Sequence, residues 1–161
     1  MARDKEIEID TRLGRRSIQT DKIVHFPRGL AGFENEREFI LLQIVPDAPL
    51  LILQSVHLPQ VGLLVADPYS FLDKTYAPAV SAAELQILQL KSLRDAAILL
   101  TVSIPAGEPD KAVLNLTGPI VINHAACLGL QVPQSADDVQ QVSMYHAAQQ
   151  GADATSTQQK K

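Results

Sequence analysis

Residues that could do chemistry are few in this chain and lie far apart in the sequence. The histidines lack the i, i+4 spacing of a helical metal pair, although a folded barrel could still gather them into one site. Single acids such as Asp47 and Asp67 have no second carboxylate close by, so no glycosidase pair is indicated. We therefore predict no metal site among His25, His57, His124 and His146. We expect instead that His25 caps a strand end and that His57 and His124 lie in loops.

Cys127 follows His124 by three residues, a spacing that could join a nucleophile to its base. A reactive thiolate needs an electropositive, partly exposed setting, whereas the neighbours here are alanines and a leucine, which favours a packed thiol. Cys127 is the single cysteine, so an internal disulfide and a cysteine-rich zinc site are excluded. No GxxxxGKS/T or GxGxxG phosphate loop is present. We predict no cofactor; a hydrolase that uses Cys127 or His25 remains an alternative.

Composition restricts the possible classes of protein further. The chain has 161 residues, of which 46% are apolar and 20% charged, as expected for one domain with a sizeable core. A net charge of −4 and only 4% aromatic residues argue against nucleic-acid binding, which needs basic and stacking surfaces. An RNA-binding barrel of the oligonucleotide-fold type is the alternative. The start, MARDKEIEID, has no signal-peptide pattern, so we expect a cytoplasmic protein without membrane segments.

Short apolar segments, separated by proline, glycine or aspartate, run through most of the chain. Each is too short for a typical helix and is bounded by turn-forming residues, which favours strands. The pattern predicts a mainly β fold, a small closed or partly open antiparallel barrel or sandwich. The predicted strands lie within residues 6–10, 17–26, 39–42, 50–53, 61–65, 96–104, 112–116 and 120–122.

One short helix is predicted at about residues 81–91. Ser81 and Glu84 have the spacing of a capping box, and Leu85 and Leu88 supply an apolar face. From residue 135 the chain becomes rich in Gln, Ala and Ser, so we divide it into a barrel domain, 1–134, and a C-terminal segment, 135–161. Within that segment we expect a short amphipathic helix around residues 139–145 and then a disordered polar tail.

The decamer at positions 25–34, HFPRGLAGFE, has the composition of a corner between two strands. Pro27 lacks an N–H, so the preceding strand must end near Phe26. Gly29 and Gly32 can adopt positive φ and so reverse the chain within a few residues. Three bulky side chains could then anchor the corner in the core: Phe26, Leu30 and Phe33.

The order of residues in this decamer closely resembles the HFPxGLxGFE signature of the flagellar assembly factor FliW family. Further blocks resemble that family in the same order: EFILL at 38–42, LQSVHLPQVGLLVADP at 53–68, and NLTGPIVIN at 115–123, where Gly118 replaces the usual alanine. The resemblance covers roughly residues 5–133. The family's usual C-terminal stretch is poorly matched here.

The resemblance implies a non-enzymatic, barrel-like protein that binds two partners. One partner is flagellin before export, and the other is CsrA, a dimeric RNA-binding repressor of flagellin translation. The resemblance also implies that the protein antagonises CsrA allosterically. Flagellin that accumulates would then occupy the protein and release CsrA, so translation of flagellin would fall as the flagellin level rises. We expect a monomer that makes no direct contact with nucleic acid.

The matched blocks also supply candidate partner-binding residues, chosen because their types are polar or their positions exposed. An alternative is that several only satisfy backbone groups: Gln54, Ser55 and Asn123 at strand ends, and Asp67 as a turn cap. The candidates are Phe33, Glu34, Glu36, Gln54, Ser55, Asp67 and Asn123.

Overall fold

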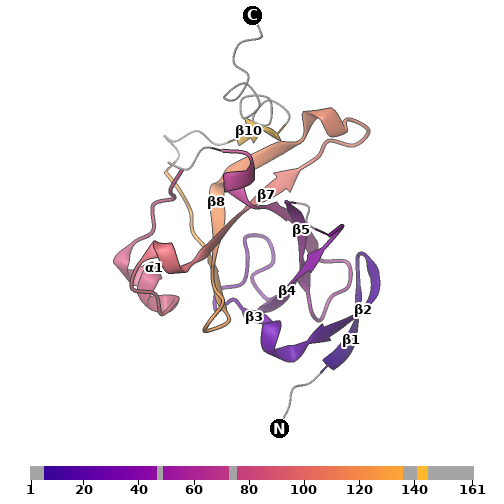
Figure 1. Ribbon diagram of the computed structural model, residues 1–161, viewed down its shortest axis with the longest axis horizontal. Helices are drawn as coiled ribbons and strands as arrows, with labels where there is room; N and C mark the ends of the chain where they lie inside the picture. The colour runs from indigo at the N-terminus through magenta and orange to yellow at the C-terminus, as the bar shows by residue number, and fades with distance from the viewer. Residues whose placement is uncertain (1–5, 47–48, 73–75, 136–140, 145–161) are drawn as a thin grey trace, which may run out of the picture.

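The computed structural model describes residues 6–46, 49–72, 76–135 and 141–144 and shows a β-barrel with one short helix (Figure 1). Within this part of the chain, no helix is long and apolar enough to cross a membrane. The strands are β1 Glu6–Thr11, β2 Gly14–Gln19, β3 Val24–His25, β4 Glu38–Gln43, β5 Leu50–Ser55, β6 Gly62–Ala66, β7 Ala97–Ser103, β8 Val113–Asn123, β9 Leu128–Gln131 and β10 Gln141–Ser143. The helix is α1 Ala82–Ile87, and four 3-10 turns span Thr20–Lys22, Pro68–Ser70, Leu93–Asp95 and Pro109–Lys111.

Strands β3 to β9 close into a barrel, which confirms the predicted fold class. Their order is β8-β7-β6-β5-β4-β3-β9, and β9 pairs again with β8. Every pairing is antiparallel except β3 with β9, which meet in parallel at His25 and Leu128. β3 is only two residues long, and the N–H of His25 donates to the Cys127 carbonyl at 2.8 Å. The barrel is therefore closed by one very short strand.

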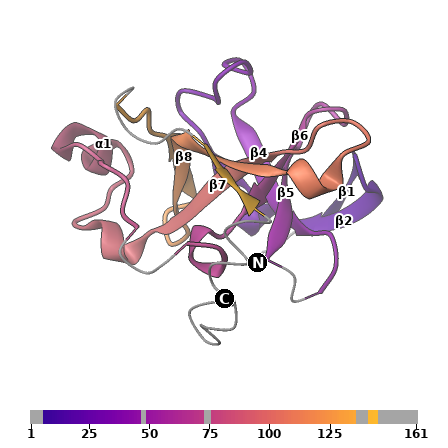
Figure 2. The same ribbon diagram turned by 90° about the horizontal axis from the view of Figure 1, so that it is seen from above.

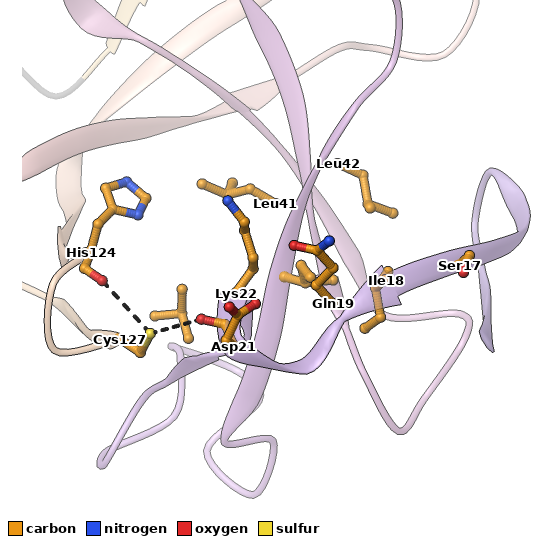
Figure 3. A pocket seen from close by; sticks show the side chains of 11 residues that line it. Ser17, Ile18, Gln19, Asp21, Lys22, Leu41, Leu42, His124 and Cys127 are labelled. Carbon is orange, nitrogen blue, oxygen red and sulfur yellow. Dashed lines mark hydrogen bonds between the residues drawn. The ribbon is translucent and has the colours of Figure 1, made fainter. Parts of the chain in front are cut away.

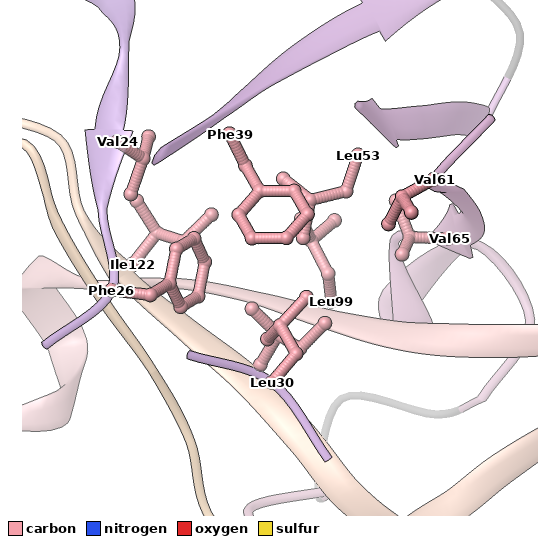
Figure 4. Close-up of a cluster of buried hydrophobic side chains, with 10 residues drawn as sticks. Val24, Phe26, Leu30, Phe39, Leu53, Val61, Val65, Leu99 and Ile122 are labelled. Atoms are coloured by element: carbon pink, nitrogen blue, oxygen red, sulfur yellow. The ribbon is translucent and has the colours of Figure 1, made fainter. Parts of the chain in front are cut away.

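A large aromatic contact fills the barrel beside this closing strand. Phe26 and Phe39 are fully buried and pack edge to face, with ring centroids 5.4 Å apart (Figure 4). On β9, Gly129 leaves room for the Phe26 ring, because a Cβ at that position would lie 2.5 Å from ring carbons. Around the pair lie aliphatic side chains from five elements: Val24, Leu53, Val65, Leu99 and Ile122.

Strands β1 and β2 form a separate hairpin that packs on β4 through Ile9, Ile18 and Ile40. On its exposed side the Arg15 guanidinium donates to Asp10 at 2.7 Å and to Glu8 at 3.1 Å, and these bonds raise its pKa. The pairs are well exposed, so they contribute little to stability. Packing of the isoleucines, rather than these charges, fixes the hairpin to the barrel.

Helix α1 begins as the sequence predicts but ends earlier, at Ile87 rather than near residue 91. The capping box is formed, with both the Ser81 and Glu84 side chains bonded to backbone N–H groups. Gln89 takes a positive φ of 58°, and the N–H of Leu90 donates to the Leu85 carbonyl, as in a Schellman motif. This left-handed residue stops the helix. α1 lies on the side of the barrel away from the hairpin (Figures 1 and 2).

The two apolar segments predicted at 112–116 and 120–122 belong to one strand, β8. The pairing with β7 shifts register between Leu99 and Thr101, so residues 116–119 form a bulge that accommodates Pro119. Two carbonyls of the bulge accept hydrogen bonds from the chain after β9. The Pro119 carbonyl accepts the N–H of Val132 at 2.9 Å, and the Thr117 carbonyl accepts the N–H of Gln134 at 2.8 Å. A bulge explains why a proline and a glycine interrupt a continuous strand.

In the C-terminal segment, the predicted short helix is wrong at residues 141–143, which form β10 instead. This strand pairs with the first part of β8, where Gln141 lies opposite Asn115. β-sheet pairing with β8 outweighed the weak helical pattern of the sequence. The expectation for residues 136–140 and 145–161 lies outside the described residues, and the division at residue 134 stays a prediction.

The close approach of Gly129 to Phe26 generates a prediction about stability. Gly129→Ala should lower the free energy of unfolding by about 1–3 kcal/mol, because the new methyl overlaps a ring that has no free space. Phe26→Leu should relieve part of this overlap, so the double variant should be more stable than the sum of the two single changes implies. Denaturant unfolding of the four proteins measures this coupling; strict additivity would contradict the contact.

Candidate functional site

The decamer at positions 25–34, called here the decamer loop, is a rigid corner. Gly29 adopts a φ of +64°, and its N–H donates to the Phe26 carbonyl at 3.0 Å. Leu30 and Phe33 pair through their backbones, and the Leu30 side chain is buried in the core. A Cβ on Gly29 would lie 2.5 Å from the Glu34 carbonyl oxygen. The predicted corner is confirmed, and only glycine fits at its centre.

Phe33 and Glu34 form the exposed tip of this loop. The expectation that Phe33 anchors the loop in the core is wrong, since 36% of its surface is exposed; Phe26 and Leu30 are the anchors. The Glu34 carboxylate accepts the N–H of Gly32 at 3.0 Å. The backbone carbonyl of Glu34 accepts a hydrogen bond from the Arg37 Nε at 3.1 Å. The tip therefore presents an aromatic ring beside a carboxylate on a fixed backbone.

Gln131 of β9 joins the decamer loop to the bulge of β8. Its Oε1 accepts the N–H of Ala31 at 2.8 Å, and its Nε2 donates to the carbonyl of Gly118 at 3.0 Å. A Cβ on Gly118 would lie 2.9 Å from that Nε2, so the glycine makes room for the amide. Beside it is a pocket of about 320 Å³, lined in part by Arg28, Glu34, Thr117 and Pro133. Two of the blocks on which the family resemblance rests thus meet at one surface.

Ser55 and Gln54 hold the loop that follows β5. The Ser55 hydroxyl donates to the Glu36 carboxylate at 2.8 Å and accepts the N–H groups of His57 and Leu58. The Gln54 Nε2 lies 3.1 Å from the carbonyl oxygens of Pro59 and Val61. Gln54 and Ser55 are fully buried, which matches the alternative role as backbone partners.

Asn123 and Asp67 also bond to the backbone near their own strand ends. The Asn123 Nδ2 donates to the Leu88 carbonyl at 2.8 Å, and its Oδ1 accepts the N–H of Ala125 at 3.1 Å. Asp67 is exposed and accepts the N–H of Tyr69 at 3.0 Å, as a turn cap does. Of the seven candidates, the structure brings together five: Phe33, Glu34, Glu36, Ser55 and Gln54, whose Nε2 donates to the Ser55 carbonyl at 3.1 Å. No interaction joins these five to Asp67 or Asn123 in the described part of the chain.

A second pocket, of about 410 Å³, lies between β2, the Thr20–Lys22 turn, β4 and the turn that precedes β9 (Figure 3). His124 and Cys127 line it. The thiol is half-buried and contacts the carbonyl oxygens of Asp21 (3.3 Å) and His124 (3.7 Å). Among the described residues, no group of three or more His, Cys, Asp or Glu could hold a metal ion. No sequence pattern indicates this pocket, because residues far apart in the chain form it.

A tyrosine pair lies elsewhere in the fold, near the Pro68–Ser70 turn. The Tyr69 hydroxyl donates to the Tyr76 carbonyl at 2.7 Å. Burial raises the pKa of Tyr76 to about 12, and Tyr69 adds to that shift. Burial therefore favours the neutral phenol of Tyr76 over its charged form.

The two glycines of the decamer loop provide a matched test of how much the close approach at Gly29 matters for stability. Gly29→Ala should lower the free energy of unfolding by more than about 3 kcal/mol, because the methyl meets the backbone of Glu34. Gly32 also has a positive φ but open space around it, so Gly32→Ala should cost only the left-handed strain, about 1–2 kcal/mol. Thermal and denaturant unfolding measure both; equal losses would mean that the close approach has no effect.

Comparison with known proteins identifies the family. A sequence profile described as FliW protein matches residues 8–145. The flagellar assembly factor FliW of Desulfovibrio desulfuricans is 68% identical over 146 residues, covering 90% of this chain and 88% of the relative. That of Nitratidesulfovibrio vulgaris is 60% identical over 135 residues, covering 84% and 78%. A crystal structure of the flagellar assembly factor FliW, 32% identical, superposes with a TM-score of 0.75 over 86% of this chain and 96% of that one. The chain is thus similar to these relatives in both sequence and fold, and it belongs to the FliW family of flagellar assembly factors.

Proposed function

We propose that this flagellar assembly factor is a non-enzymatic, monomeric cytoplasmic protein that binds flagellin and the translational regulator CsrA in turn. When flagellin is scarce, the protein holds CsrA, and flagellin translation proceeds. When flagellin accumulates, it occupies the protein and CsrA is released to repress translation. The proposal starts from membership of the FliW family.

The observation that carries the proposal is the exposed tip of the decamer loop, where Phe33 lies beside Glu34. An aromatic side chain on a rigid backbone loses little conformational freedom on binding, so it suits the centre of a protein interface. The neighbouring carboxylates, together with the net charge of −4, favour encounter with a basic partner surface. We assign CsrA to this surface.

Antagonism of CsrA by an allosteric route requires that CsrA bound to this protein has lower affinity for RNA. By linkage, RNA must then weaken the binding of this protein to CsrA by the same factor. Flagellin and CsrA must likewise weaken each other's binding, and exclusion of one by the other is the limiting case.

Substitutions at the loop tip test the surface. Phe33→Ser and Glu34→Lys should each weaken CsrA binding about ten-fold or more, a loss of at least about 1.4 kcal/mol, measured by calorimetric titration. Ile104→Ser is the matched control, because Ile104 is an exposed apolar residue (47%) on the β7–β8 connection. Unchanged affinity in both loop variants, with the fold intact, would remove the decamer loop from the CsrA site.

The partner exchange itself is tested by titrating CsrA into the unmodified protein, alone and after saturation with flagellin. Heat that appears in the first titration and vanishes in the second supports mutually exclusive binding. An absence of heat at several temperatures in the first titration would contradict CsrA binding. Salt-sensitive retention of the protein on a polyanionic resin would favour the alternative of an RNA-binding barrel.

A further inference from the structure

Strand β4 has a stretch of edge that no described strand covers. It pairs with β5 from Phe39 to Gln43, but with β3 only at Glu38 and Phe39. β3 begins only at Val24, because the residues before it, Thr20–Lys22, form a 3-10 turn that connects it to β2 and does not continue the pairing with β4. Residues 40–43 therefore have a partner strand on one side alone.

The hydrogen-bonding groups on the uncovered side can be identified from the neighbouring bonds. The Arg37 carbonyl accepts the Phe26 N–H on the β3 side, and the Glu38 carbonyl accepts the Val56 N–H on the β5 side. Alternation along an antiparallel ladder then directs the N–H and C=O groups of Leu41 and Gln43 toward the β3 side. No described strand pairs with either residue there.

This open edge lies against the 410 Å³ pocket, which Ile40, Leu41 and Leu42 line from β4 (Figure 3). Ile18 of β2 and Val24 of β3 add to its apolar lining. The two residues that follow β4 are also exposed and apolar: Ile44 (38%) and Val45 (54%). Soluble proteins protect such edges with charges, prolines or covering loops, whereas here the edge ends in two exposed aliphatic residues.

We propose that the β4 edge at Leu41–Gln43 is a binding site for an extended peptide segment of a partner protein, which adds to the sheet as a strand. Main-chain hydrogen bonds to Leu41 and Gln43 supply affinity, and the pocket receives an aliphatic side chain of the segment. This site is additional to the decamer-loop surface and does not depend on it.

The shape and charge of the pocket select this occupant. Residues of β2 and of the turn at 124–127 line the pocket on either side of the edge, and its volume of about 410 Å³ suits side chains of a single extended segment. Asp21 and Lys22 both line the pocket, and no described carboxylate, that of Asp21 included, forms an ion pair with Lys22. An acidic side chain of the segment would pair with Lys22, so the segment should alternate aliphatic and acidic or polar residues.

Amide hydrogen exchange, resolved by NMR on the full chain, tests the open edge. In the free protein, the N–H groups of Leu41 and Gln43 should exchange at least about ten-fold faster than those of Ile40 and Leu42, which face β5. Equal protection of all four amides would overturn the proposal, because the edge would then already be covered.

The second measurement uses a defined probe, a seven-residue capped peptide in which valine alternates with glutamate and threonine. Millimolar peptide should slow exchange at Leu41 and Gln43, while the same peptide with N-methyl groups on its edge-facing amides should not. Ser17→Trp should fill the pocket and abolish the effect, whereas Arg16→Trp, on the same strand but outside the pocket, should preserve it. No protection by the unmethylated peptide, equal effects of the two peptides, or dimer formation in place of peptide binding would overturn the proposal.

Discussion

Closure of the barrel depends on how tightly the Phe26 ring packs against Gly129. β3 is too short to hold two neighbouring strands together by main-chain bonds alone, since it pairs with β4 at two positions and with β9 at one. The buried ring that follows it joins β3 to the rest of the core through Phe39. Because any side chain at position 129 would occupy the space of the ring, the seam between β3 and β9 requires a glycine there. The decamer loop begins at this seam, so its geometry follows from the same contact.

Side-chain amides hold the loops around this core. Gln54 binds the turn after β5, Asn123 binds the end of α1, and Gln131 binds the decamer loop to the β8 bulge. Each amide satisfies backbone groups that no strand or helix reaches, and leaving such a group unpaired in a buried place costs about 1–3 kcal/mol. These amides are therefore part of the scaffold.

The two surfaces differ in the interactions they offer. The decamer loop presents side chains, an aromatic ring and a carboxylate, on a backbone held by the bond of Gly32 to Glu34 and by the close approach of Gly29 to Glu34. The β4 edge presents main-chain donors and acceptors beside an apolar pocket, which suits a segment that is unfolded before it binds. Under the two proposals made above, a small barrel would recognise a folded surface and an extended chain at separate places.

The sequence by itself determined the fold class, the capping box of α1, the corner at Gly29 and the family, because each depends on local residue types and their order. It did not determine the end of α1, where Gln89 adopts a left-handed conformation that few residues other than glycine favour. Nor did it separate Phe33, which is exposed, from Phe26, which is buried, since both are phenylalanines in one loop. Burial of Gln54, Ser55 and Asn123, the β8 bulge and the open edge of β4 were decided by tertiary structure, because each depends on which distant strand lies opposite.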